Sequence, residues 1–208
     1  MATKTITRNI GLRDIYVAEV TEDTESKYTA GTPVKLARAL SAKITDKFNS
    51  ENIYSDDMLE DVIECYSETE VELKINTLSQ EAYTKLYTTL NDNGFLAKSG
   101  EDMAKKVALG FRSKRSDGTY DFVWLYAGKF TDRPEFEYNT LEDKPSPKEQ
   151  TIKGVFSARQ KADTIGGKEK HLYQIQVNEC ELVDENTEAK TAIGAWFEAV
   201  QEYKAHSI

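Results

Sequence analysis

The feature that most constrains this chain is a stretch of eight residues, 68–75, in which charged and uncharged side chains alternate without exception. It reads Glu68-Thr69-Glu70-Val71-Glu72-Leu73-Lys74-Ile75. A period of two sends successive side chains to opposite faces of a β-strand. The sequence therefore predicts a strand with one face in the core. Its other face must be wet, and it carries Glu68, Glu70, Glu72 and Lys74.

The same period predicts further strands at 14–20, 34–44, 151–158 and 172–177. A hairpin is expected with arms at 107–111 and 120–126, because Asp117-Gly118 between them suits a tight turn.

Two amphipathic helices complete the expected elements. The first begins after Ser79, a suitable N-cap, and ends at Asn93-Gly94. The second covers 193–203, where apolar residues recur at helical spacing. The fold class expected is mainly β with two flanking helices.

The length of 208 residues fits one domain. Residues 1–13 lack a usable period and are interpreted as an N-terminal arm, with a single domain at 14–208. Two long loops are expected inside it. One is the polar segment 49–58, which should protrude, and the other is 132–149, which is rich in proline and charge.

Composition excludes several function classes. The formal net charge of −9 opposes a tight grip on nucleic acid, whose phosphates attract basic surfaces. No apolar run is long enough to span a bilayer and no secretory signal is visible, so we expect a cytosolic protein without membrane insertion. Cys65 and Cys180 lack metal-ligand spacing and are expected to be free, packed thiols.

Catalytic side chains are scarce. His171 and His206 are the only histidines, and neither accompanies a catalytic motif. The carboxylate pairs Asp56-Asp57 and Glu135 with Glu137 could serve acid–base chemistry or bind calcium, but solvated loops are favoured. We expect a protein that is not an enzyme, with no cofactor and no metal.

Basic and aromatic residues leave alternatives open. Lys105-Lys106 and 112–115 could touch nucleic acid, but in an acidic chain contacts with carboxylates between subunits are favoured, with Lys106, Arg112 and Lys114 as candidates. The aromatic row at 120–126 suits a core or a subunit seam better than a platform for stacking sugars.

Several strings, in their order along the chain, carry a family resemblance. They are Ile10-Gly11-Leu12-Arg13-Asp14-Ile15-Tyr16, Val20-Thr21-Glu22-Asp23-Thr24, Gly31-Thr32-Pro33, Tyr54-Ser55-Asp56-Asp57, Glu70-Val71-Glu72-Leu73, Val107-Ala108-Leu109-Gly110-Phe111-Arg112-Ser113-Lys114, Val123-Trp124-Leu125-Tyr126, Gly128-Lys129-Phe130 and Trp196-Phe197. With these, the chain resembles the major tail proteins of siphophages that infect Gram-positive bacteria.

The resemblance implies an antiparallel β-sandwich of the phage tail-tube type that contributes to the inner β-barrel of a hexameric ring. Stacked rings form the tube through which DNA is ejected. The implied partners are further copies of the chain, the tape measure protein and other tail proteins. Double-stranded DNA would pass without specific binding. The protein would be assembled in the host bacterial cytoplasm and end in the virion tail.

Two site hypotheses follow from combining this resemblance with the patterns. The wet face at 68–74 would line the lumen, where its carboxylates would keep DNA from adhering. The segment 49–58 would reach the adjacent ring, with Asn52, Tyr54, Asp56 and Asp57 as candidates. The competing readings are a monomeric β-sandwich carbohydrate-binding module with exposed aromatics at 120–126, an enzyme of unknown type, and a subunit of a contractile or secretion-type tube.

Overall fold

The β8–β9 hairpin lies at the centre of the structure, a computed structural model that describes residues 7–56, 58–135, 140 and 149–204. β8 (Val107–Arg115) pairs antiparallel with β9 (Tyr120–Asp132). Gly118 lies in the turn with φ +91°, a backbone conformation that glycine adopts without strain. The hairpin predicted from its alternating side chains and its Asp-Gly turn is therefore confirmed.

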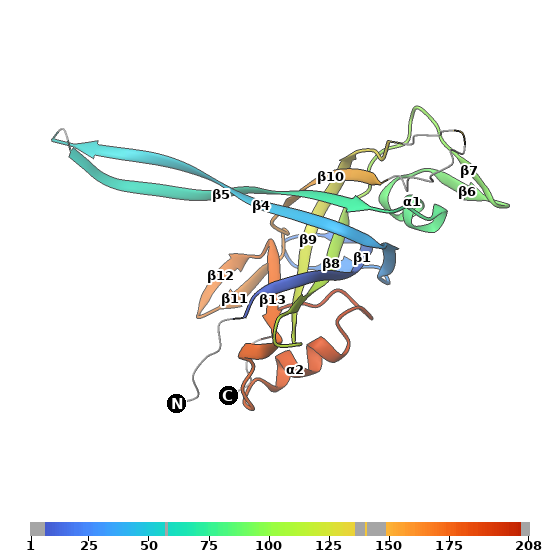
Figure 1. Cartoon of the computed structure of the whole chain (residues 1–208). Helices are drawn as coiled ribbons and strands as arrows, with labels where there is room; N and C mark the ends of the chain where they lie inside the picture. The colour runs from blue at the N-terminus through green and yellow to red at the C-terminus, as the bar shows by residue number, and fades with distance from the viewer. Residues whose placement is uncertain (1–6, 57, 136–139, 141–148, 205–208) are drawn as a thin grey trace.

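The sheet extends on both sides of this hairpin in the order β2-β1-β8-β9-β10-β5-β4, with β3 paired to β1 and β13 paired to β9 (Figure 1). All of its pairings are antiparallel. The other strands of this sheet are β1 (Asn9–Asp23), β2 (Tyr28–Ala30), β3 (Val34–Ala37), β4 (Ala39–Ser55), β5 (Met58–Ile75), β10 (Gln150–Ser157) and β13 (Gln174–Asn178).

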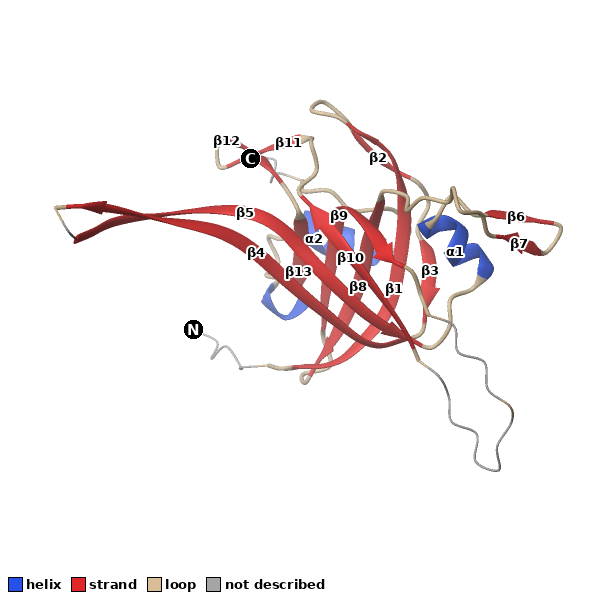
Figure 2. Cartoon of the chain, turned by 90° about the horizontal axis from the view of Figure 1, so that it is seen from above, coloured by secondary structure: helices blue, strands red, loops and turns tan. Residues whose placement is uncertain are grey.

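Smaller elements lie around the sheet, and the second helix lies against one of its faces (Figure 2). They are the hairpin of β6 (Leu90–Asp92) and β7 (Phe95–Ala97), the hairpin of β11 (Ala162–Ile165) and β12 (Lys168–His171), the helices α1 (Gln80–Leu86) and α2 (Thr187–Gly194), and the 3₁₀ turn η1 (Glu179–Glu181). The expected class, mainly β with two helices and an antiparallel sheet, is confirmed. Neither helix in the described part of the chain has the length or the apolar content needed to cross a membrane.

One face of the curved sheet encloses the main core. Thr69, Val71, Leu73 and Ile75 of β5 point inward and are all buried, as the alternation predicted. Val71, Leu73 and Ile75 pack with apolar side chains of β1, β8, β9, β10 and α1. The opposite side chains of β5 face solvent, so the period of two separates core from water along this strand.

The other face of β8 and β9 is covered by α2 and the segment after it. Trp124 of β9 packs against Trp196 and donates a hydrogen bond from Nε1 to the Trp196 carbonyl at 3.0 Å. The Tyr126 hydroxyl donates to the Gln201 carbonyl, also at 3.0 Å. This explains why the helix expected at 193–203 is wrong. The Trp196 and Gln201 carbonyls accept from β9 side chains, and the helix lies earlier, at Thr187–Gly194.

A buried arginine holds the segment after α2 against the same face of the sheet. The Arg159 side chain has no exposed surface and pairs with Asp163 and, at 2.8 Å, with Glu202 near the C-terminus. Its guanidinium lies 4.3 Å from the Tyr126 ring centroid. A buried charge is tolerated only when it is paired, so these contacts hold Glu202 and its segment against the sheet.

The first helix is shorter than expected. Ser79 caps it, as predicted, by accepting a hydrogen bond from the Ala82 amide at 3.1 Å. The helix ends at Leu86 rather than at Asn93-Gly94. Those two residues have φ +50° and +79° and form the turn between β6 and β7. Positive φ at both central positions is the requirement of a tight hairpin turn, which competes with the role of helix stop.

Three predicted boundaries are wrong. The single strand expected at 34–44 is instead β3 followed by the start of β4, which pair with β1 and β5 respectively. Residues 9–13, assigned to the N-terminal arm, belong to β1, because Asn9 already pairs with Arg115 of β8. Residues 49–58 are not a loop, because β4 continues to Ser55 and β5 begins at Met58. The segment does protrude, as a paired ribbon (Figure 1). Both of its faces are wet, so it lacks the alternation that marks a half-buried strand. Most of the predicted loop 132–149 lies outside the described residues.

Close packing over Gly128 yields a test of the core. A Cβ at this position would lie 2.3 Å from the Phe156 ring. We expect Gly128→Ala to lower the free energy of unfolding by about 1–3 kcal/mol, because a packed ring on the neighbouring strand must shift. Urea unfolding checks this against Gly100→Ala, whose Cβ would meet nothing within 4 Å. Equal stability of the two variants would contradict the packing described.

Candidate functional site

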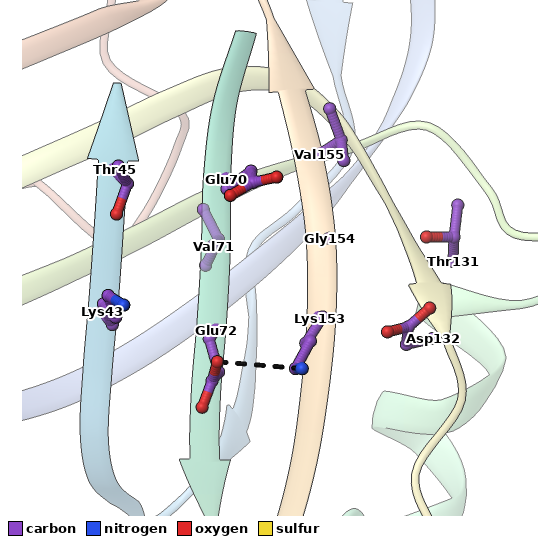
Figure 3. Close-up of a pocket in the computed structure, with 10 residues that line it drawn as sticks. All are labelled: Lys43, Thr45, Glu70, Val71, Glu72, Thr131, Asp132, Lys153, Gly154 and Val155. Atoms are coloured by element: carbon purple, nitrogen blue, oxygen red, sulfur yellow. Dashed lines mark ion pairs between the residues drawn. The ribbon is translucent and has the colours of Figure 1, made fainter. Parts of the chain in front are cut away.

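The solvent face of β4, β5 and β10 carries a ladder of opposite charges (Figure 3). Lys43 lies opposite Glu72, and Lys47 lies opposite Glu68, in the β4–β5 register. The Lys47 ammonium forms ion pairs with Glu70 and, at 3.5 Å, with Glu68. From the other side, Lys153 of β10 approaches Glu72 at 3.9 Å. Hydrogen bonding to Glu70 raises the pKa of Lys47, so the lysine stays charged.

The ladder is mixed in sign rather than acidic, which corrects the expectation of an acidic wet face. The exposed charges that the four strands bring to this face are Lys43, Lys47, Lys74, Lys129 and Lys153, together with Glu68, Glu70, Glu72 and Asp132. The partner cations lie in β4, β9 and β10, far from 68–74 in sequence. The alternation within β5 correctly predicts which side chains face solvent. It contains no information on the lysines that the neighbouring strands place beside them.

A shallow hollow of about 300 Å³ lies in the middle of this ladder. β4, β5, β9 and β10 all contribute to its lining (Figure 3). Among its charged groups, Glu72 pairs with Lys153, and Glu70 pairs with the neighbouring Lys47. This arrangement presents a wet, charge-compensated wall rather than a pocket that desolvates a ligand.

Beyond Lys47 and Glu68 the two strands leave the body as a ribbon, which we call the arm (residues 48–66). At its root, Tyr66 stacks on Tyr173 with ring centroids 4.2 Å apart. Farther out, every side chain that is described up to Cys65 is exposed. The exposed large apolar residues of the arm are Phe48, Ile53, Tyr54, Met58, Leu59, Val62 and Ile63.

The residues predicted to contact another ring lie at the end of the arm. Asn52 and Tyr54 belong to the last part of β4, and Asp56 lies in the turn with φ +50°. Asp57 lies outside the described residues. Tyr54 is 66% exposed, so the tip offers an aromatic ring to whatever it meets.

The three cations proposed as an intersubunit cluster do not form one cluster. Lys106 lies at the first end of β8 and pairs with the buried Asp23 at 2.7 Å. Arg112 lies at the other end, where it pairs with Asp14 at 2.6 Å and stacks over the Tyr120 ring. Lys114 forms no ion pair within the described residues. Two of the three cations are therefore engaged inside their own chain.

The remaining candidates from the sequence are two histidines, two cysteines and the carboxylates considered as metal ligands. His171 is exposed at the end of β12, while His206 and Glu137 lie outside the described residues. Cys65 and Cys180 are free but exposed, so the expectation that they are packed is wrong. In the described ranges, no group of three or more His, Cys, Asp or Glu side chains is arranged to hold a metal ion.

The aromatic row of β9 is buried. Phe122, Trp124 and Tyr126 are at most 6% exposed, beneath Trp196 and the C-terminal segment. Burial raises the pKa of the Tyr126 hydroxyl, consistent with a side chain removed from water. These rings form a core and not a stacking platform.

Comparison with known proteins adds no relative. No protein-family model matches the chain, and no curated protein matches it significantly.

Asp14 of β1, which pairs with Lys35 of β3 and Arg112 of β8, offers a pH test of these ion pairs. Partial burial raises the pKa of this carboxyl, but hydrogen bonds from Lys35 and Arg112 outweigh it and leave the pKa below its usual value. We expect Asp14→Asn to cost about 1 kcal/mol of unfolding free energy at pH 7. Asparagine also tolerates the φ of +52° at this position, so the backbone should not be disturbed.

The sign of the pH dependence follows from the lowered pKa. The contribution of Asp14 is present above its unfolded pKa of about 3.9 and is lost as the pH falls through the folded value. The two proteins should therefore converge in stability near pH 2 to 3 in urea titrations. Asp92→Asn, at an exposed position without an ion pair among the described residues, is the control. A gap that stays constant down to pH 2 would contradict the ion pairing.

Proposed function

We propose that this protein is the major tail tube subunit of a long-tailed bacteriophage, a structural virion protein that polymerises as stacked hexameric rings and forms the conduit for DNA ejection. The observation that carries the proposal is the arm. The arm is the outer part of β4 and β5, which have 17 and 18 residues, and the inner parts of both strands belong to the sheet. The body of the protein does not contact the outer half of the arm (Figure 2).

An unsupported two-stranded ribbon is marginally stable in water. This ribbon also exposes seven large apolar side chains, a density typical of surfaces that other proteins cover. Contact with further copies of the chain would supply the missing partner. The arm then becomes a device for association, in agreement with the subunit role that the sequence resemblance implies.

The free edge of the sheet supports the same proposal. β4 is the last strand of its sheet and pairs only with β5 in the described chain. A long exposed edge promotes uncontrolled strand pairing unless it is covered. Closing identical copies into a ring covers such edges with symmetry-related contacts. In that ring the charge ladder would form part of the lumen wall.

The charge ladder suits the passage of DNA for a reason different from simple repulsion. Lys47 and Lys153 pair with carboxylates of β5, which reduces the positive charge that they offer to phosphates. The same pairs compensate Glu68, Glu70 and Glu72, so these carboxylates oppose entry of the polyanion less than free ones would. With five lysines against four carboxylates, the charges of this face nearly cancel, so DNA would move along it with little adhesion.

The competing reading of a carbohydrate-binding module loses its specific support. It required the aromatic residues at 120–126 to be exposed, whereas Trp124 and Tyr126 have no exposed surface. Sugar binding would have to use other residues.

Removal of the arm tests the proposal. Asn49 and Cys65 lie directly opposite each other, so an Asn-Gly turn can join them and replace residues 50–64. We expect cylinders in negative-stain images of the concentrated wild-type protein, and folded monomers for the shortened variant. Circular dichroism and the thermal midpoint confirm that the body of the variant is intact. Wild-type protein that never forms cylinders, or a shortened variant that still does, would refute the proposal.

Charge reversal tests the wall. In the triple variant Glu68→Lys, Glu70→Lys and Glu72→Lys, the face would hold eight lysines and one carboxylate. We expect tubes to form but DNA ejection to slow, because unpaired lysines bind phosphates. The matched variant with glutamine at the same positions should show a smaller delay, and both delays should shrink at high salt. Ejection that is as fast in the lysine variant as in the wild type would exclude a lumen role for this face.

A further inference from the structure

We infer that the arm of one copy docks onto the cationic end of the sheet of a second copy, defined as residues 8–14 of the β1 region, Lys35, and residues 112–117 of the β8–β9 hairpin. This inference rests on the proposed function and names the surface that receives the arm. It follows from two unbalanced charge distributions on the same molecule.

The arm is strongly acidic. Between Phe48 and Tyr66 the sequence contains six carboxylates and neither Lys nor Arg. The carboxylates are Glu51, Asp56, Asp57, Glu60, Asp61 and Glu64. Like charges on a narrow ribbon repel one another, and they lie beside exposed apolar groups such as Ile63. A partner that stabilises the arm must therefore offer both positive charge and apolar surface.

The cationic end of the sheet has this chemistry. It carries six basic residues and only two carboxylates, Asp14 and Asp117. The basic residues are Arg8, Arg13, Lys35, Arg112, Lys114 and Arg115. Asp14 is shared by Lys35 and Arg112, and Arg115 donates hydrogen bonds to Thr7. Arg8, Arg13 and Lys114 form no ion pair within the described chain.

Apolar surface and a free strand edge accompany these cations. Ile10 is 63% exposed at the start of β1. Residues 9–13 of β1 pair with β8 on one side, and β3 joins β1 only from Ile15 onward. In the described chain the outer backbone edge of 9–13 is therefore unpaired. Such an edge can receive the backbone of another strand as well as its side chains.

The arm does not reach this surface within its own chain. Both views show the arm extending away from the body in the direction of β4 and β5 (Figures 1 and 2). Pairing with β5 continues to the tip, which keeps the ribbon extended. Contact between the two surfaces thus requires a second copy. Such a heterologous contact repeats from copy to copy and suits polymerisation.

A charge-swap experiment tests the inference on the full chain. We expect the arm variant Glu51→Lys, Glu60→Lys and Glu64→Lys to raise the protein concentration needed for tube assembly by about tenfold or more. The receiving variant Arg8→Glu, Arg13→Glu and Lys114→Glu should do the same. A chain carrying all six substitutions restores opposite charges at the contact, so assembly should recover to within about threefold of the wild type.

A second basic patch supplies the control. Lys168 and Lys170 lie exposed on β12, so Lys168→Glu with Lys170→Glu removes a similar charge elsewhere. This variant should assemble like the wild type. Failure of the control with normal assembly of the receiving variant would place the docking surface at β12 and overturn the inference. Wild-type protein that forms no tubes would instead refute the proposed function itself.

Cross-linking keeps the inference testable if a variant misfolds. Wild-type tubes assembled from a mixture of ¹⁴N- and ¹⁵N-labelled chains are treated with a carbodiimide that joins carboxylates to lysines in contact. We expect mixed-isotope cross-links between arm peptides and the peptide containing Lys114. Arm cross-links that involve only lysines outside the cationic end would overturn the inference even when tubes form.

Discussion

The structure depends on residues 121–128 of β9 being buried on both faces of the strand. Val123, Leu125 and Phe130 point into the main core, while Phe122, Trp124 and Tyr126 point into the core under α2. β9 also pairs with three strands, β8 along its length, β13 near its start and β10 near its end. β10 pairs with β9, β5 pairs with β10, and β4 pairs with β5, so the position of β9 determines the positions of these three strands. The charge ladder and the arm are positioned through that chain of pairings.

The arm follows from the same pairings carried beyond the core. Close to β10, the β4–β5 ribbon has one buried face, and the pairing is supported by packing of Val71 and Leu73. Farther out the hydrogen-bond register continues but the core does not. The free energy that orders the outer half must then come from another molecule, since exposed backbone pairs contribute little net stability in water. A rigid root and an unsupported tip are the combination that a subunit contact requires.

Local patterns in the sequence predicted the parts of the fold that depend on one core face. The strand at 68–75, the Asp117-Gly118 hairpin and the Ser79 cap belong to this group. For the arm the sequence predicts a loop, because a ribbon that is exposed on both faces leaves no alternation of apolar and polar residues. The helix expected at 193–203 failed because hydrogen bonds from Trp124 and Tyr126, more than 70 residues away, hold that backbone in another form. The charge ladder was misread for a similar reason, since its lysines lie on neighbouring strands.

Uncompensated negative charges are concentrated on the arm and not on the charge ladder. A net charge of −9 suggests a wall that repels DNA, yet in the face proposed as the wall Lys47 and Lys153 pair with carboxylates of β5. The excess of carboxylates lies instead on the arm, which has six of them and no cation. Uncompensated like charges destabilise an isolated ribbon. At a contact between subunits, the same charges favour binding to one oppositely charged surface over others. In the tube proposed here, the acidity of the chain would therefore serve recognition between subunits, while local pairing keeps the lumen inert.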